Sequence, residues 1–219
     1  GARLATEHLI KLGHTRIAFI NGPQGWVASE NRLSGYCDTL ESHGIPFEPH
    51  LVLNGDWDAP SGYQCALRLL QLDERPTAIF AANDIMALGA IYASREAGLQ
   101  VPDDVAIVGY DDQDIGRLAN PTLTTVCMPS HEMGQRAVQS LLEQLDQAGP
   151  RTTGPSYVPG ALIVRESCGD PQGRYVAWSS AREQYFSRTV PQSIIGRTST
   201  VQPGRPPEPQ QHWAPVSLK

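Results

Sequence analysis

One stretch of the sequence decides the fold class: Val105-Ala106-Ile107-Val108-Gly109-Tyr110-Asp111-Asp112, an apolar run that ends at two carboxylates. A second run, Ala78-Ile79-Phe80-Ala81-Ala82, ends in the same way at Asn83-Asp84. Short β-branched and aromatic runs between turn residues are typical of strands that are buried on both faces, as in a parallel sheet covered by helices. Ligands of such sheets bind beside the carboxyl ends of the strands. The two runs therefore predict a small-molecule cleft at that edge.

Helical and strand patterns alternate along the rest of the chain. Apolar residues at helical spacing, bounded by glycine or proline, predict helices at 1–12, 29–43, 60–72, 84–97 and 132–145. Besides the two runs above, we expect strands at 16–20, 51–53 and 161–164 and a brief extended piece at 121–126. This alternation predicts an α/β fold, a doubly wound parallel sheet with right-handed crossovers.

The composition is that of an ordinary globular protein, with 40% hydrophobic and 18% charged residues over 219 positions. A formal net charge of -6 argues against direct contact with nucleic acid, which needs clustered lysine and arginine. The four cysteines lie far apart without a C-x-x-C pattern, so we expect reduced thiols in a cytoplasm rather than zinc or disulfides. We find neither a signal-peptide pattern nor a membrane-spanning run and expect no membrane contact.

Polar and aromatic side chains gather where the strands are expected to end. They are Asn21, Asp56 with Trp57, Asn83 with Asp84, and Asp111 with Asp112. Carboxylates and amides beside an aromatic ring suit a sugar-like ligand, because hydroxyls form paired hydrogen bonds and a sugar ring stacks on tryptophan. Arg32, near the start of the second helix, could also reach a ligand hydroxyl or carboxylate.

Each of these residues also has a purely structural interpretation. Asp84 could cap the helix that follows it, Trp57 could be a packed loop residue, and Arg32 could be a solvated helix charge. The acidic run at 111–114 could instead hold Mg²⁺, although no nucleophile or base is placed beside it. The patterns G-x-G-x-x-G, G-x-x-x-x-G-K-[ST] and G-x-S-x-G are absent, so the sequence indicates no cofactor and no enzyme.

A series of ordered motifs resembles the effector-binding domain of LacI/GalR-type bacterial transcriptional repressors. The motifs occupy 1–9, 13–17, 32–36, 55–57, 75–80, 83–90, 101–105, 109–112 and 123–126, followed by Leu162-Ile163-Val164-Arg165-Glu166-Ser167. The resemblance extends from Gly1 to about Cys168. It implies a periplasmic-binding-protein-like sensor of two lobes, which closes on a sugar-like or nucleoside-like effector and so alters operator binding.

The resemblance also assigns residues and partners. It places the effector contacts at Arg32, Trp57, Asn83 and Asp111, and the surface that meets a second subunit of a homodimer at Leu88 and the Leu118 region. DNA would be bound only through a helix-turn-helix headpiece, which is absent from this chain. Residues 1–168 would form the sensor domain, mainly its carboxyl-terminal lobe, with 124–150 belonging to the other lobe.

The sequence departs from the family pattern at both ends. Nearly all of the amino-terminal lobe is missing, so we expect a fragment that holds one wall of the cleft and binds effector weakly or not at all. The proline-rich, glutamine-rich and serine-rich stretch 169–219 is expected to be a disordered tail. A periplasmic sugar-binding protein of a transport system is the alternative of the same fold. Within the cleft, we expect Asp111 to accept a ligand hydrogen bond and Asp112 to brace the following loop.

Overall fold

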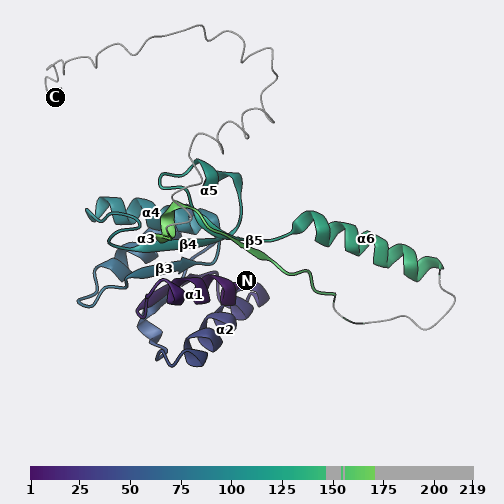
Figure 1. Ribbon diagram of the computed structural model, residues 1–219, viewed down its shortest axis with the longest axis horizontal. Coiled ribbons are helices and arrows are strands. Elements are labelled where there is room, and N and C mark those ends of the chain that lie inside the picture. Colours follow the sequence, from purple (N-terminus) through teal and green to yellow (C-terminus); the bar gives the residue numbers. More distant parts are fainter. Residues whose placement is uncertain (147–153, 155, 171–219) are drawn as a thin grey trace, which may run out of the picture. The chain divides into compact units, whose positions relative to one another are not determined.

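A computed structural model describes residues 1–146, 154 and 156–170 of the chain (Figure 1). Its helices and strands, in chain order, are α1 (Ala2–Lys11), β1 (Ile17–Asn21), α2 (Val27–Ser42), β2 (Val52–Asn54), α3 (Ala59–Leu70), β3 (Ala78–Ala81), α4 (Asp84–Glu96), β4 (Ala106–Asp111), α5 (Asp114–Leu118), β5 (Thr124–Cys127), α6 (Ser130–Asp146) and β6 (Ala161–Ile163). Short 3₁₀ turns occupy Pro49–Leu51 and Glu166–Cys168. The predicted helices and strands are all present, and α5 is an additional short helix.

The strands form one six-stranded sheet in the order β2-β1-β3-β4-β5-β6. All adjacent pairs among β1 to β5 are parallel, which confirms the predicted α/β fold with a mostly parallel sheet. The exception is β6, which runs antiparallel to β5. The last residue of β5, Cys127, pairs with the first residue of β6, Ala161. The chain therefore re-enters the sheet at the carboxyl end of β5, and β6 runs back in the opposite direction.

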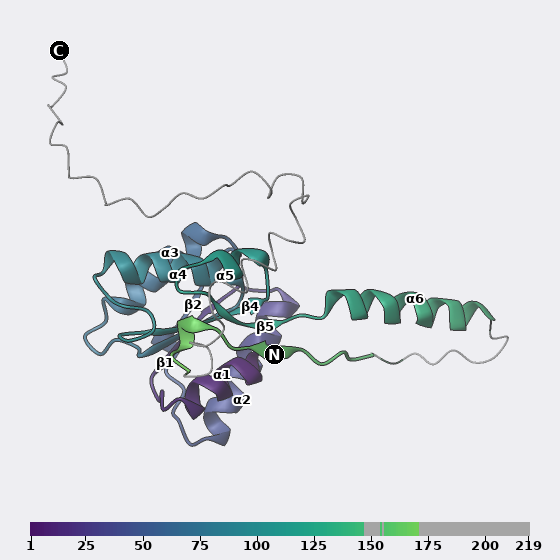
Figure 2. The same cartoon turned by 45° about the horizontal axis from the view of Figure 1, so that its top comes forward.

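Helices cover both faces of the sheet (Figure 1, Figure 2). The purple and blue helices α1 and α2 lie on one face, and α3, α4 and α5 lie on the other. Strands β1 and β3 are buried along their whole lengths, as expected of central parallel strands. Phe19 stacks on Phe80 at 4.8 Å and on Tyr36 at 5.2 Å between ring centroids, and the Tyr36 hydroxyl donates to the Ile17 carbonyl. This aromatic cluster anchors α2 to the sheet.

Two glycines let α3 and α4 pack backbone to backbone. A Cβ on Gly62 would lie 2.4 Å from the Met86 carbonyl oxygen, and a Cβ on Gly89 would lie 2.3 Å from the Ala59 carbonyl oxygen. No side chain fits in that space, so the two helices are held at a fixed close distance. Because each helix begins just beyond a strand end, this contact also fixes the segments that precede α3 and α4.

The segment after β6 is hydrogen-bonded to β4 and β5. Ser167 accepts a hydrogen bond from the Thr124 amide and donates one to the Ile107 carbonyl, at 2.9 and 2.6 Å. Thr124, in β5, also donates to the Arg165 carbonyl. Residues 124–127 are therefore a strand of this sheet. The assignment of 124–150 to a second lobe stays a prediction for the remainder of that range.

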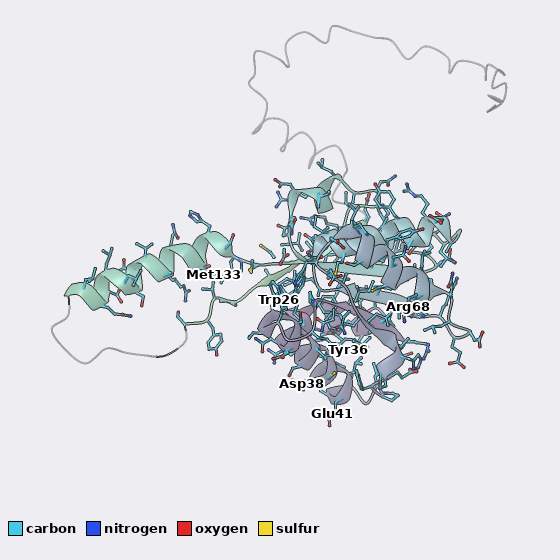
Figure 3. All side chains as sticks on the ribbon, turned by 180° about the vertical axis from the view of Figure 1, so that it is seen from behind. Trp26, Tyr36, Asp38, Glu41, Arg68 and Met133 are labelled. Carbon is cyan, nitrogen blue, oxygen red and sulfur yellow. The ribbon has the colours of Figure 1, made fainter. Side chains whose placement is uncertain are left out.

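The helix α6 differs from the other long helices because its apolar side chains are exposed. Met133 (labelled in Figure 3), Val138, Leu141, Leu142 and Leu145 have exposed fractions from 44% to 80%. No helix in the described part of the chain is long and apolar enough to cross a membrane. Of the predicted tail, only residues 169 and 170 are among the described residues.

Candidate functional site

The four predicted effector contacts, Arg32 among them, lie beside the carboxyl ends of the parallel strands. Strands β1, β3 and β4 are neighbours, so their carboxyl ends bring together the segments that begin at Asn21, Asn83 and Asp111. The segment after β2, on the other side of β1, carries Trp57. Arg32 projects from α2 and contacts both Asp111 and Trp57. Parallel strand order therefore accounts for a cluster whose members are far apart in the sequence.

Arg32 is held between two aromatic rings. Its guanidinium carbon lies 4.1 Å from the Tyr110 ring centroid and 5.4 Å from that of Trp57, which are cation–π distances. One terminal nitrogen is 3.6 Å from Asp111 Oδ1. The Arg32 Nε is buried and has no hydrogen-bond partner among the described residues. The rings and Asp111 thus hold the Arg32 side chain in place, while its Nε donor remains without an acceptor.

Trp57 is placed by an unusual backbone. Its φ of 65° is in the left-handed region, which is costly for a bulky residue. Its ring lies against Gly22, where a Cβ would approach the ring to 2.1 Å. The indole nitrogen is buried without a partner in the described part of the chain. Backbone strain of this kind persists where the surrounding structure fixes it, and is common at ligand sites.

Asn83 has a structural role that the sequence interpretation assigned to its neighbour. Its Oδ1 accepts from the Met86 amide at 2.8 Å, so Asn83 caps α4, and Asp84 is the first residue of the helix. The capping interpretation of Asp84 is therefore wrong. Asn83 Nδ2 donates to the Trp57 carbonyl at 2.9 Å. Asn83 thus fastens the Trp57 segment to α4, and its contact with an effector stays a prediction.

The two carboxylates that follow β4 have different surroundings. Asp111 and Asp112 both have left-handed backbones, with φ of 110° and 54°. Asp112 accepts hydrogen bonds from Arg117 and Arg165, which agrees with its expected role as a brace. Within the described part of the chain, the Asp111 side chain has only the long Arg32 contact and a 3.4 Å hydrogen bond from Gln113. Burial raises the pKa of Asp111, although the Arg32 charge opposes this effect.

These ion pairs also bear on whether the acidic run at 111–114 could bind Mg²⁺. Both oxygens of Asp112 face arginine nitrogens, so this carboxylate is committed to ion pairs. Among the described residues no group of three or more histidine, cysteine or acidic side chains is arranged to hold a metal ion. The geometry gives no support to the Mg²⁺ interpretation.

Sequence reasoning missed three contributors to the cluster. Tyr110 stacks on Arg32, and Trp26, at the start of α2 (Figure 3), meets Trp57 edge to face at 6.2 Å between centroids. Trp26 is 57% exposed. Ser29, one turn before Arg32 on α2, has a buried hydroxyl without a partner in the described structure. An exposed tryptophan in a glycine-rich loop directly after a strand was the signal that could have identified Trp26.

A second feature lies on α4 and α5. Leu88 and Leu118, the predicted subunit contacts, line one groove with Ile91, Tyr92, Arg95 and Ile115. Tyr92, Ile115 and Leu118 have exposed fractions of 55%, 38% and 41%. Apolar surface gathered in this way is typical of protein contact sites.

Residues 6–168 match the periplasmic binding protein-like domain family. Among curated proteins, the transcriptional repressor PurR of Haemophilus influenzae strain PittEE is 42% identical over 169 residues, which are 76% of this chain and 50% of that protein. PurR of Mannheimia succiniciproducens is 37% identical over 167 residues, with the same two shares. The chain thus spans about half the length of the curated relatives it matches.

Solved structures give the same picture. The transcriptional regulator CelR, solved as a complex with cellobiose, has a TM-score of 0.67 at 39% identity, over 76% of this chain and 51% of that one. A dimeric Lac repressor with an 11-residue carboxyl-terminal deletion has a TM-score of 0.71 at 38% identity, over 77% of this chain and 60% of that one.

Proposed function

This chain belongs to the periplasmic-binding-protein-like effector domains of LacI-family transcriptional regulators, and from that membership we propose that it senses a neutral, polyhydroxylated small molecule. The ligand binds at the cluster formed by Arg32, Trp57 and Asp111, and its binding alters the affinity of the intact regulator for DNA. The domain is a sensor and not an enzyme.

The unused donors of the cluster are the observation that carries this proposal. Buried polar groups in folded proteins are almost always hydrogen-bonded, because an unpaired buried donor costs about 1–3 kcal/mol. Arg32 Nε, Trp57 Nε1 and the Ser29 hydroxyl are buried and lack partners in the described structure. A sugar hydroxyl accepts from such donors and donates to Asp111 at the same time, while its ring packs on an indole.

The charges of the cluster favour a neutral ligand. Arg32 is opposed by Asp111, and the second carboxylate, Asp112, is opposed by Arg117 and Arg165. An anionic ligand would have to compete with Asp111 for the Arg32 guanidinium. Cellobiose, the ligand in the CelR complex, is a sugar of the expected kind. A nucleoside offers fewer hydroxyls but presents a flat base to the two indoles, so it is the competing ligand class.

The assembly and location of the intact regulator follow from the same reasoning. The Leu88 and Leu118 groove forms the contact with a second subunit, because it gathers partly exposed apolar side chains on α4 and α5. DNA is bound by a headpiece outside this chain. All four cysteines are free, which favours a reducing cytoplasm over the periplasm of a transport protein.

The test is a ligand titration on two proteins. The first is the 219-residue chain, and the second joins this chain to the amino-terminal half of the Haemophilus influenzae relative. We expect isothermal titration with cellobiose, monosaccharides and adenosine to show sugar binding by the joined protein and much weaker binding by the chain alone. Arg32→Ala should weaken binding at least tenfold.

Arg68→Ala is the matched control, since Arg68 is exposed on α3 (Figure 3) and outside the cluster. Equal sugar affinity in the Arg32 and Arg68 variants would contradict the proposed site. Binding of adenosine and of no sugar would contradict the proposed ligand class.

A further inference from the structure

Asp84 is a fully buried carboxylate beneath the candidate site. Its exposed fraction is 0%, although it is the first residue of α4, a position that is usually solvated. Asp84 Oδ1 accepts from the Thr125 hydroxyl at 2.5 Å, and Oδ2 accepts from the Gln113 amide at 2.6 Å. It crosses the face of Gly109, where a Cβ would lie 2.3 Å from Oδ1. One side chain therefore links α4, β5 and the start of α5.

The hydrogen bonds of Asp84 surround the left-handed turn that follows β4. Gln113, the cap residue of α5, comes directly after that turn and donates its amide to Asp84. On the other side, the Asp112 amide donates to Thr125 Oγ1 at 3.4 Å, and the Thr125 hydroxyl donates onward to Asp84. Two consecutive amides of the strained turn are thus held by the same carboxylate, one directly and one through a hydroxyl.

We propose that Asp84 is the positioning residue of this site: in its ionised form it holds the 111–113 turn in the conformation that presents Asp111 to the ligand. An ionised carboxylate accepts both hydrogen bonds at full strength, whereas a protonated one has an oxygen that must donate. The Gln113 amide cannot accept a proton from Oδ2, and a proton on Oδ1 would have to be donated to Thr125 Oγ1, which reverses that hydrogen bond and weakens the acceptor of the Asp112 amide. Protonation of Asp84 therefore loosens the turn. The inference rests on the proposed function, because the turn matters through Asp111.

Burial of Asp84 supports the proposal because it brings the protonation of this carboxylate close to neutral pH. Desolvation raises the pKa of Asp84 to about 6, against the effect of its hydrogen bonds from Thr125 and Gln113, and the charges of Asp111 and Asp112 raise it further. The other charged or titratable groups on the elements packed around it are Tyr110 on β4, Asp114 and Arg117 on α5, Cys127 on β5 and Arg165 after β6. Arg117 and Arg165 pair with Asp112, which leaves Asp84 without a cation of its own among the described residues.

Amide NMR of the ¹⁵N-labelled 219-residue chain tests the proposal without any ligand. Between pH 4.5 and 7.5, we expect the Gln113 and Asp112 amide resonances to shift together with a midpoint near 6. Asp84→Asn should remove this titration from both amides. Thr125→Val removes the hydroxyl that joins the Asp112 amide to Asp84. It should remove the titration from Asp112 and preserve it at Gln113, with a higher midpoint because the lost hydrogen bond lowers the pKa of Asp84.

Asp114→Asn is the matched control, because Asp114 is an exposed carboxylate in the first turn of α5. It should leave both titrations unchanged. A Gln113 titration that survives Asp84→Asn, or a wild-type Gln113 amide that does not move in this range, would overturn the proposal. If Asp84→Asn does not fold, the difference between the two amides in Thr125→Val decides the question. A sugar titration that fails would count against the proposed function alone, since the NMR result needs no ligand.

Discussion

The two ends of the parallel strands use arginine in opposite ways. At the amino-terminal end, Arg16 donates from Nη1 to both oxygens of Glu48 and from Nε to the Glu74 carbonyl, and its Nη2 is 3.1 Å from His50 Nε2. At the carboxyl-terminal end, Arg32 lies between aromatic rings, 3.6 Å from Asp111, with an unused Nε. All the described non-glycine residues with positive φ also lie at this second end. One end is a closed structural network, and the other, which we call the open end, keeps buried polar atoms without partners in the described structure.

The largest expected effect tests the open end. In an intact regulator that carries this domain, Asp111→Asn should weaken effector binding by about 100-fold, or ~2.7 kcal/mol. The physical reason is that the amide supplies one acceptor where the carboxylate supplies two. Operator binding without effector should be unchanged, as measured by gel shift with and without the sugar. A response to effector that persists in this variant would show that Asp111 is not a contact of the effector.

A second prediction concerns pH. Because the pKa of Asp84 is about 6 in the folded chain and 3.8 is its ordinary value, the folded state binds the extra proton. Stability should therefore fall as pH rises from about 4 to 6 and then level off, with a total contribution of roughly 3 kcal/mol. Asp84→Asn should lack this component. Urea denaturation of both proteins at pH 4.5 and 7.5 measures it, and identical pH dependence in the two would refute the prediction.

The smallest expected effects compare the two ends directly. Arg16→Met should lower the free energy of unfolding by about 1–2 kcal/mol, because it removes charge-assisted hydrogen bonds that are only partly exposed to solvent. Effector affinity should not change, since Arg16 lies at the other end of β1.

Ser29→Ala is the counterpart at the open end. The Ser29 hydroxyl is buried without a partner in the described structure, so its removal should raise stability, by up to the about 1–3 kcal/mol that an unpaired buried donor costs. Thermal melts of both variants give the comparison. A loss of stability in Ser29→Ala as large as that in Arg16→Met would contradict the view that polar groups at the open end are unpaired and those at the other end are paired.

Much of this organisation could be predicted from local sequence patterns. Hydrophobic periodicity predicted the strands and long helices, because buried strands and amphipathic helices impose different repeats. The position of Arg32, Trp57, Asn83 and Asp111 at one edge followed from parallel strands and a family resemblance. The roles of these four residues in ligand binding stay predictions.

Other features depend on three-dimensional packing that no local pattern contains. The reversed direction of β6 is set by where the chain returns to the sheet, and not by its own residues. Asn83 rather than Asp84 caps α4 because Asp84 turns inward toward Thr125, more than 40 residues away in the sequence. Tyr110 stacks on Arg32 because the fold brings a side chain of α2 to the end of β4.

The hydrogen bonds of the segment after β6 have a consequence for biosynthesis. Ser167 reaches back to Ile107, which is 60 residues earlier, and Arg165 reaches back 53 residues to Asp112. During translation, β1 to β4 can leave the ribosome and pair while the brace on the turn after β4 has still to be synthesised. The nascent domain would then expose an unpaired β5 edge until β6 emerges. A chaperone that recognises strand edges would have its binding window during this interval.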